Sequence, residues 1–207
     1  LGFSMYPGEM EGLLQLVGAA VVKEILLEGR ILTATEAYEK GLLTRVVAAE
    51  ELAAYLAKSA GLQTRVLGED NLTAPDAADA YVGACAYTKS AGLCPETPAE
   101  ESFVVKTQGG KLFIFGQDAP GAPFSSSTAT GTLYGVYDFI ENELGAIWIW
   151  PGESGEFLPR RDGLHLPALD RRQQPRFIIR EMIFGYLKYE PKPFNDALGP
   201  WRKRMKL

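Results

Sequence analysis

The feature that most constrains this 207-residue chain is a change in the spacing of its apolar residues near Gln63. Before that residue, apolar side chains recur at helical spacing in residues 9–28 and 48–60, which predicts two amphipathic helices that stop at Gly29 and Gly61. After Gln63, apolar and polar residues alternate, as they do in strands with one buried face. The chain is therefore predicted to combine helices with strands.

The clearest local signal is a β-hairpin. Its strands are predicted at residues 103–106 and 111–115, and Gly109-Gly110 between them supplies the positive φ angles that a tight primed turn needs. Further strands are predicted at residues 64–67 and 80–87, where the same alternation occurs. These segments indicate a sheet built around at least one antiparallel pair.

A further helix is predicted at residues 132–144, because the apolar residues there share one face and Gly145 follows. A short strand at 147–150 comes next, and the tail is predicted to alternate turns with short strands around Phe157, Leu164–Leu166 and residues 177–179. Hairpin strands with helices packed on one face indicate the α+β class with a mostly antiparallel sheet, not a doubly wound parallel sheet.

The first 47 residues have a different pattern. After the helix at 9–28, Thr33 and Glu36 are spaced as in a capping box, which would open a short helix that ends at Gly41. A brief strand-like run follows at residues 44–47. Because this helix-rich segment does not share the pattern of the rest, a domain boundary is predicted near residues 47–49.

Charge is distributed unevenly around a formal net charge of −5. Residues 1–159 hold 9 Lys and Arg against 21 Asp and Glu, whereas residues 160–207 hold 12 against 5. An acidic body with a basic tail can indicate an anionic partner, or it can be a solvated surface around strand ends. The overall negative charge gives no reason to expect nucleic acid as that partner.

The sequence contains few features that would indicate a membrane segment, a secretory signal or a disulfide framework. No apolar stretch approaches the roughly 18 residues of a membrane span, so no membrane partner is expected. The sequence begins at Leu1 and shows no secretory signal. Two cysteines, Cys85 and Cys94, are too few for a disulfide scaffold, and whether they pair is left open.

No complete set of catalytic residues is predicted. His165 is the only histidine, so neither a zinc site nor a Ser–His–Asp triad is expected, and no nucleotide-binding motif points to a cofactor. Glycoside hydrolysis needs paired carboxylates. Glu141 and Glu143 diverge if they lie on a helix, and the solvation of a turn accounts for Glu153 and Glu156.

Trp148 and Trp150 are separated by one residue, so in a strand their side chains share a face. Such a face can stack on the apolar side of a sugar ring. It can equally pack beneath the preceding helix as core. Both interpretations stay open, and the two tryptophans are candidates for a substrate-binding site.

Several of these segments together resemble a known domain, the N-terminal domain of bacterial glycoside-hydrolase-like proteins. That domain is related to the non-catalytic domain ahead of the barrel in β-hexosaminidases and α-glucuronidases. The resemblance begins near Ala48 and extends to the end of the chain, so it implies an accessory domain at 48–172. It is carried by residues 48–56 (AAEELAAYL), 80–83 (AYVG), 103–116 (FVVKTQGGKLFIFG), 131–145 (GTLYGVYDFIENELG), 148–152 (WIWPG) and 157–160 (FLPR).

The resemblance also implies a following (β/α)₈ barrel that would hold the catalytic acids. Residues 173–207 would be the start of a truncated barrel or a tail, and 175–180 (PRFIIR) looks like the entry of its first strand. By the resemblance to β-hexosaminidases, Arg180 would hold a sugar hydroxyl. The residues after it, 181–184 (EMIF), depart from that pattern. The chain is therefore expected to be inactive alone, with carbohydrate and a barrel domain as partners in an exported parent glycosidase.

The first 47 residues are instead similar to the later part of the crotonase (enoyl-CoA hydratase/isomerase) family, without its catalytic segment. The similarity is carried by Leu1-Gly-Phe, Pro7-Gly8, 16–18 (LVG), 27–31 (LEGRI), Glu36-Ala37 and 40–47 (KGLLTRVV). The two resemblances meet at residues 46–52, as they would in a chimaera. Three hypotheses remain: an accessory domain of a carbohydrate-active protein, a fragment of an acyl-CoA hydratase/isomerase, and a sugar-binding module.

Overall fold

A computed structural model describes residues 14, 18–24, 26–27, 47–68, 71–74, 76–90, 92–93, 100–119, 124, 128–177, 180 and 192–206. The chain forms two compact units, Leu1–Val46 with Gly68–Asn71, and Val47–Leu67 with Leu72–Leu207. In the first unit, the described residues between 14 and 27 are helical, within the helix predicted at 9–28. The expected capping box and short helix lie outside the described residues, so the crotonase-fragment hypothesis stays a prediction.

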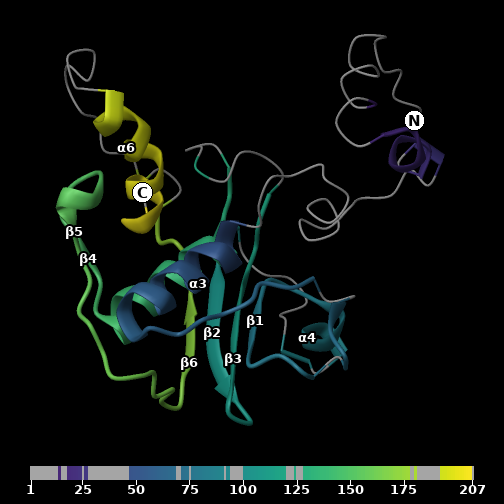
Figure 1. Cartoon of the computed structure of the whole chain (residues 1–207), viewed down its shortest axis with the longest axis horizontal. Coiled ribbons are helices and arrows are strands. Elements are labelled where there is room, and N and C mark those ends of the chain that lie inside the picture. The colour runs from purple at the N-terminus through teal and green to yellow at the C-terminus, as the bar shows by residue number, and fades with distance from the viewer. Residues whose placement is uncertain are drawn as a thin grey trace. The chain divides into compact units, whose positions relative to one another are not determined.

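The second unit is built on a four-stranded sheet in the order β1-β3-β2-β6 (Figure 1). Its strands are β1 (Ala80–Val82), β2 (Phe103–Gln108), β3 (Lys111–Gly116) and β6 (Asp170–Gln173). β1 pairs with β3 in parallel, whereas β2 pairs with β3 and with β6 in antiparallel fashion. The predicted α+β class with a mostly antiparallel sheet is therefore confirmed.

The predicted hairpin forms the centre of this sheet. β2 and β3 pair from Phe103 opposite Gly116 to Gln108 opposite Lys111. Gly109 and Gly110 make the turn with φ angles of 59° and 78°. Both angles lie in the left-handed region that glycine adopts without steric cost, as a primed turn requires.

One face of the sheet is covered by two helical layers. α5 (Gly131–Phe139) continues into the π-helical turn η2 (Ile140–Leu144), which confirms the helix predicted at 132–144, and it packs directly on the sheet. α3 (Val47–Ala60) packs with it into the same core and stops where Gly61 takes a φ of 67°. The centre of this core contains Leu52, Leu56, Val105, Ile114, Leu133, Val136 and Ile140.

The opposite face of the sheet carries a second, smaller core, which differs from the prediction that helices would lie on one face. The ring of Phe113 stacks on Tyr81 at 5.2 Å between centroids, and on Tyr87 of the short helix α4 (Ala86–Ser90) at 6.3 Å. Val104, Phe115 and Leu93 complete the cluster. The long helices therefore share one face, and α4 covers part of the other.

The strand predicted at 80–87 ends early because α4 begins there. Gly83 turns the chain with a φ of 92°, and the fully buried Thr88 then organises the helix start. Its hydroxyl accepts a hydrogen bond from the Cys85 amide at 2.9 Å and lies 3.0 Å from the Cys85 carbonyl oxygen, to which it donates. Cys85 is half-buried at this turn, and Cys94 lies outside the described residues, so their pairing stays open.

The remaining elements differ most from the sequence prediction. β4 (Ile147–Trp148) pairs with β5 (Glu156–Phe157) around the 3₁₀ turn η3 (Glu153–Gly155). β6 and α6 (Lys192–Arg204) were not predicted, because β6 is wholly polar and α6 contains Gly199-Pro200. Residues 64–67 and Phe177 are not strands, and residues 178–179 lie outside the described part.

Candidate functional site

Charged side chains gather where the C-terminal part of the chain meets the layer formed by α3, α5 and β5. Four cations of residues 160–207 bind six carboxylates of residues 1–159. The pairs are Arg171 with Asp138 and Glu143, Arg180 with Glu101, Arg204 with Glu51 and Glu156, and Lys206 with Asp138 and Glu141. For these four cations, the anionic partner suggested by the basic tail is the acidic body of the same unit.

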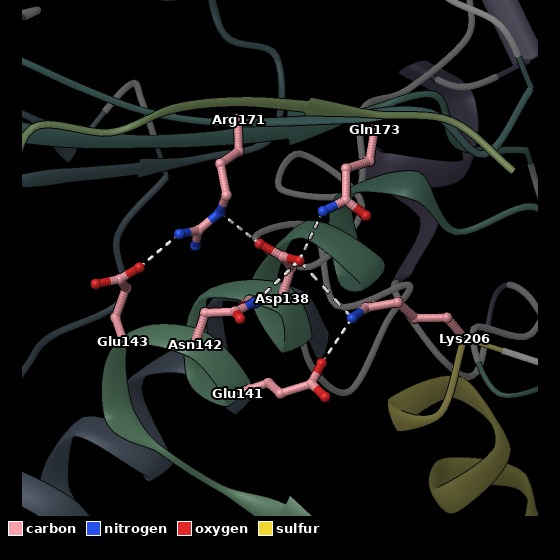
Figure 2. A network of polar contacts seen from close by, with 7 residues as sticks. All are labelled: Asp138, Glu141, Asn142, Glu143, Arg171, Gln173 and Lys206. Carbon is pink, nitrogen blue, oxygen red and sulfur yellow. Dashed lines mark hydrogen bonds and ion pairs between the residues drawn. The ribbon is translucent and has the colours of Figure 1, made fainter.

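The first group of contacts centres on Asp138, which is 1% exposed although it is a carboxylate (Figure 2). Its Oδ2 accepts a hydrogen bond from Arg171 Nε at 2.9 Å. Its Oδ1 accepts hydrogen bonds from Gln173 Nε2 and Asn142 Nδ2, both at 3.2 Å. Arg171 and Gln173 point to the same side because they are two residues apart on β6. Asp138 thus fastens the edge strand to α5.

Two further acids extend this group in different directions, as Figure 2 shows. Arg171 Nη1 lies 2.5 Å from Glu143 Oε1, and Lys206 Nζ lies 2.7 Å from Glu141 Oε2. Burial acts to lower the pKa of Arg171, but its hydrogen bonds to Glu143 and Asp138 and their negative charges raise that pKa overall. The predicted divergence of Glu141 and Glu143 is confirmed, since each binds a different cation.

The second group, called the cage below, consists of Glu51 and Tyr55 on α3, Tyr137 on α5 and Glu156 on β5, with Arg204 of α6 between them. Arg204 Nη1 lies 3.4 Å from Glu156 Oε2, and Nη2 lies 3.7 Å from Glu51 Oε2. The guanidinium carbon is 5.8 Å from the ring centroid of Tyr55 and 5.9 Å from that of Tyr137. These distances are within the range of cation–π attraction.

Hydrogen bonds inside the cage hold its two carboxylates in place. Tyr137 Oη donates to Glu51 Oε2 at 3.1 Å, and Tyr55 Oη donates to Glu156 Oε2. Trp148 Nε1 donates to Tyr55 Oη at 2.9 Å and to Glu156 Oε2 at 3.2 Å. The pKa of Tyr55 is raised mainly by burial and next by its hydrogen bond to Glu156. The pKa of Tyr137 is raised mainly by burial and next by the negative charge of Glu51. Both phenols therefore act as protonated donors at neutral pH.

A third group joins the turn before β2 to the end of α6. Arg180 pairs with Glu101, lies 5.8 Å from the centroid of Tyr134, and donates to the carbonyl oxygens of Phe177 and Lys206, both at 3.0 Å. Lys203, 1% exposed, donates to the carbonyl oxygen of Thr128 at 2.8 Å and to Tyr134 Oη at 3.3 Å.

The structure places the three residues predicted to bind substrate in different surroundings. Trp148 and Trp150 do not share a face: Trp148 is 4% exposed in the core, whereas Trp150 is 52% exposed. The strand alternation fails because β4 ends at Trp148 and the chain bends at Pro151-Gly152 towards η3. Arg180 is placed among protein partners, so its role towards a sugar hydroxyl stays a prediction.

Two other residues considered in the sequence analysis, His165 and Glu156, lie in contrasting positions. His165 is exposed in the extended segment before β6. Glu156, which the solvation of a turn seemed to explain, instead belongs to the cage. Within the described part of the chain, no group of three or more His, Cys, Asp or Glu side chains is placed to hold a metal ion. The uneven charge was the one sequence signal for these clusters, and it does not predict which acidic residue pairs with which basic residue.

The fold defines an α+β protein. Comparison with protein-family models, with curated proteins and with solved structures finds no match. Among the helices that the structure describes, none is long and apolar enough to cross a lipid bilayer. The interpretation of function therefore depends on the residues themselves.

Proposed function

We propose that residues 48–172 form a non-catalytic accessory domain of a carbohydrate-active, glycoside-hydrolase-like protein. One observation carries the proposal: the carboxylates that gather in this unit bind cations and phenols of the same chain. Glycoside hydrolysis needs two carboxyl groups with a glycosidic oxygen or a water between them. Arg204 occupies that position between Glu51 and Glu156, and Arg171 occupies it between Asp138 and Glu143.

The same function is supported by the resemblance to the domain that precedes the barrel of β-hexosaminidases and α-glucuronidases, which begins near Ala48 and extends to the end of the chain. Under this proposal, carbohydrate and a barrel domain are partners of the parent protein. The charged clusters of this chain have a structural role, which is to hold β6 and α6 on the body.

The test is hydrolysis of aryl glycosides by the purified chain, using chromogenic N-acetyl-β-hexosaminides and α-glucuronides. We expect no turnover above buffer, and the same result for Glu51→Gln and Glu156→Gln. Turnover by the wild-type chain that either variant abolishes, while its far-UV circular dichroism stays unchanged, would show that the cage is catalytic and would contradict the proposal.

A second candidate function, a sugar-binding module, is favoured by the position of Trp150. Its half-exposed ring packs against Phe194 at 5.2 Å between centroids with a tilt of 55°, which forms a small aromatic platform at the start of α6. Amphipathic aromatic rings of this kind suit surfaces that are apolar on one side. Tryptophan fluorescence titrated with oligosaccharides and uronates is expected to respond in the wild type and not in Trp150→Ala. A flat wild-type response excludes the module.

A further inference from the structure

One face of the two-stranded ribbon formed by β4 and β5 (Figure 1) is apolar and open to solvent. Exposure alternates along its first strand: Ile147 is 53% exposed, Trp148 is 4% exposed and Ile149 is 74% exposed. The Ile149 amide donates to the carbonyl oxygen of Gly155 at 2.9 Å, so the ribbon continues to this residue. Trp148 therefore faces the core, and the two isoleucines face outward.

Phe157 completes this outward face. It lies directly opposite Ile147 in the register of β4 and β5, and residues directly opposite each other in an antiparallel pair have their side chains on the same face. It is also 58% exposed. Ile147, Ile149 and Phe157 are together called the ribbon face below.

The ribbon face departs from the usual pattern of an antiparallel pair at a protein surface. An antiparallel sheet with one face in water normally carries polar residues on that face. Here the outward residues are three large apolar side chains, which are neighbours on one surface and not scattered singly. A contiguous exposed apolar patch indicates a surface that another molecule covers.

We propose that the ribbon face is the contact between two copies of this chain, which pack face to face with their ribbons antiparallel. The inference does not depend on the proposed accessory function. Three side chains that are more than half exposed present on the order of 300–400 Å² to a partner, against roughly 800 Å² per partner in a standard interface. The predicted contact is therefore a reversible dimer of modest affinity.

The charges at the two ends of the ribbon favour a second copy in this orientation. Glu153 is exposed in η3, where the chain turns, and Arg160 is exposed at the opposite end, three residues beyond Phe157. Arg161 adds a second positive charge at that end, against the one negative charge of Asp162. Within the part of the chain that the structure describes, neither Glu153 nor Arg160 forms an ion pair, so both charges are available to a partner.

These charges distinguish the two ways in which identical ribbon faces can meet. With antiparallel ribbons, the Glu153 end of each copy lies over the Arg160 end of the other, so opposite charges meet at both ends. With parallel ribbons, each end would meet its own copy, and like charges would repel. The ribbon face is thus self-complementary in the antiparallel orientation, as a contact between two equal copies requires.

Sedimentation velocity of the full chain over a range of micromolar concentrations tests the proposal. We expect the wild type to shift reversibly from monomer to dimer as its concentration rises. Ile149→Lys places a charge in the ribbon face and should abolish the dimer. Phe177→Lys is the matched control, because Phe177 is 71% exposed but lies outside the ribbon, and it should dimerise as the wild type does.

Two charge reversals test the orientation and leave the apolar residues in place. Glu153→Arg and Arg160→Glu should each dimerise more weakly than the wild type, because like charges then meet at both ends. When the two variants are mixed in equal amounts, opposite charges meet again, and a heterodimer should form as readily as the wild-type dimer. Both changes are at exposed residues, so they also carry the test if Ile149→Lys does not fold.

Three results would overturn the proposal. The first is a wild type that stays monomeric at every concentration, which would leave the ribbon face to a different partner. The second is a dimer that Ile149→Lys and Phe177→Lys weaken equally, which would place the contact elsewhere. The third is a mixture of Glu153→Arg and Arg160→Glu that associates no better than either variant alone.

Discussion

At the scale of single residues, the polar groups of this unit act through hydrogen bonds in buried positions. Tyr55 is 2% exposed, and its hydroxyl joins the indole of Trp148 to the carboxylate of Glu156. A phenylalanine at this position would keep the ring contacts but leave the indole N–H and the carboxylate each with one bond fewer. A hydrogen bond to a charged group, such as this carboxylate, contributes more to stability than one between neutral groups.

Tyr55→Phe is therefore expected to lower the free energy of unfolding by about 1–3 kcal/mol. Tyr81→Phe is the matched control: Tyr81 is also buried, but its hydroxyl accepts a longer hydrogen bond, at 3.3 Å from the Ala78 amide. Its loss should cost less. Urea unfolding followed by circular dichroism measures both. An equal or smaller loss for Tyr55→Phe would mean that the hydroxyl of Tyr55 does not hold the cage.

Lys203 gives the unit a pH dependence that can be assigned to one group. Burial lowers the pKa of its ammonium; the charge of Glu101 raises that pKa and the charge of Arg180 lowers it, with a net decrease. Between the lowered pKa of the folded state and the ordinary 10.5, the unfolded chain binds more protons, so the free energy of unfolding rises with pH in that window.

Lys203→Met removes this contribution and keeps the apolar stem. The stability of the wild type relative to Lys203→Met is therefore expected to increase as the pH is raised from about 7 to about 10. Urea unfolding of both proteins at the two pH values measures the difference. A difference that stays constant or shrinks as the pH rises would contradict the assignment.

At the scale of elements, the junction between β3 and α5 is a tight backbone contact. A Cβ on Gly131 would lie 2.4 Å from the carbonyl oxygen of Ser102 and 2.7 Å from the amide nitrogen of Gln117. Asp118 completes the junction, because its carboxylate accepts hydrogen bonds from the Thr132 amide at 2.9 Å and from the Thr132 hydroxyl at 2.6 Å. The start of α5 is thus fixed against the end of β3.

Gly131→Ala should lower the free energy of unfolding by about 1–3 kcal/mol, because backbone atoms cannot move aside as a side chain can. Gly135→Ala in the same helix is the control. Its Cβ would lie 2.9 Å from a methyl group of Ile114, and alanine gains helix propensity there. Thermal unfolding of the two variants compares them. A smaller drop in Tm for Gly131→Ala than for Gly135→Ala would show that the junction can relax.

The elements that the sequence predicts well are those whose local signals agree with their tertiary contacts. The hairpin at Gly109-Gly110 and α5 carry both a strong apolar pattern and a glycine stop or turn. β6 escapes prediction because its residues Asp170–Gln173 are all polar, so no apolar alternation marks the strand that pairs with β2. α4 escapes because the apolar run before it continues past the turn at Gly83.

The charged clusters escape prediction for a different reason. Asp138 meets Arg171 across 33 residues, and Glu51 meets Arg204 across more than 150, so only the folded chain brings them together. The uneven charge indicated that something acidic would bind the tail. Glu156 and Asp138 are the acids that bind because β5 and α5 place them beside the tail. No local sequence pattern predicts that placement.

At the scale of the whole molecule, the charge distribution has a structural explanation within the second unit. The acidic body and the basic tail, with 9 against 21 and 12 against 5 basic and acidic residues, meet in ion pairs that join β6 and α6 to α3 and α5. The cations Arg171, Arg180, Arg204 and Lys206 are therefore used in holding the fold together. This use of charge is the central claim of the account.

A double-mutant cycle on Asp138 and Arg171, with Asp138→Asn, Arg171→Met and the double variant compared by urea unfolding, tests that claim most directly. Because the two groups bind each other at 2.9 Å in a buried position, we predict a favourable coupling of about 1–3 kcal/mol. The exposed pair of Asp170 and Arg172 should couple by less than about 0.5 kcal/mol. A coupling between Asp138 and Arg171 no larger than that of the exposed pair would contradict the account.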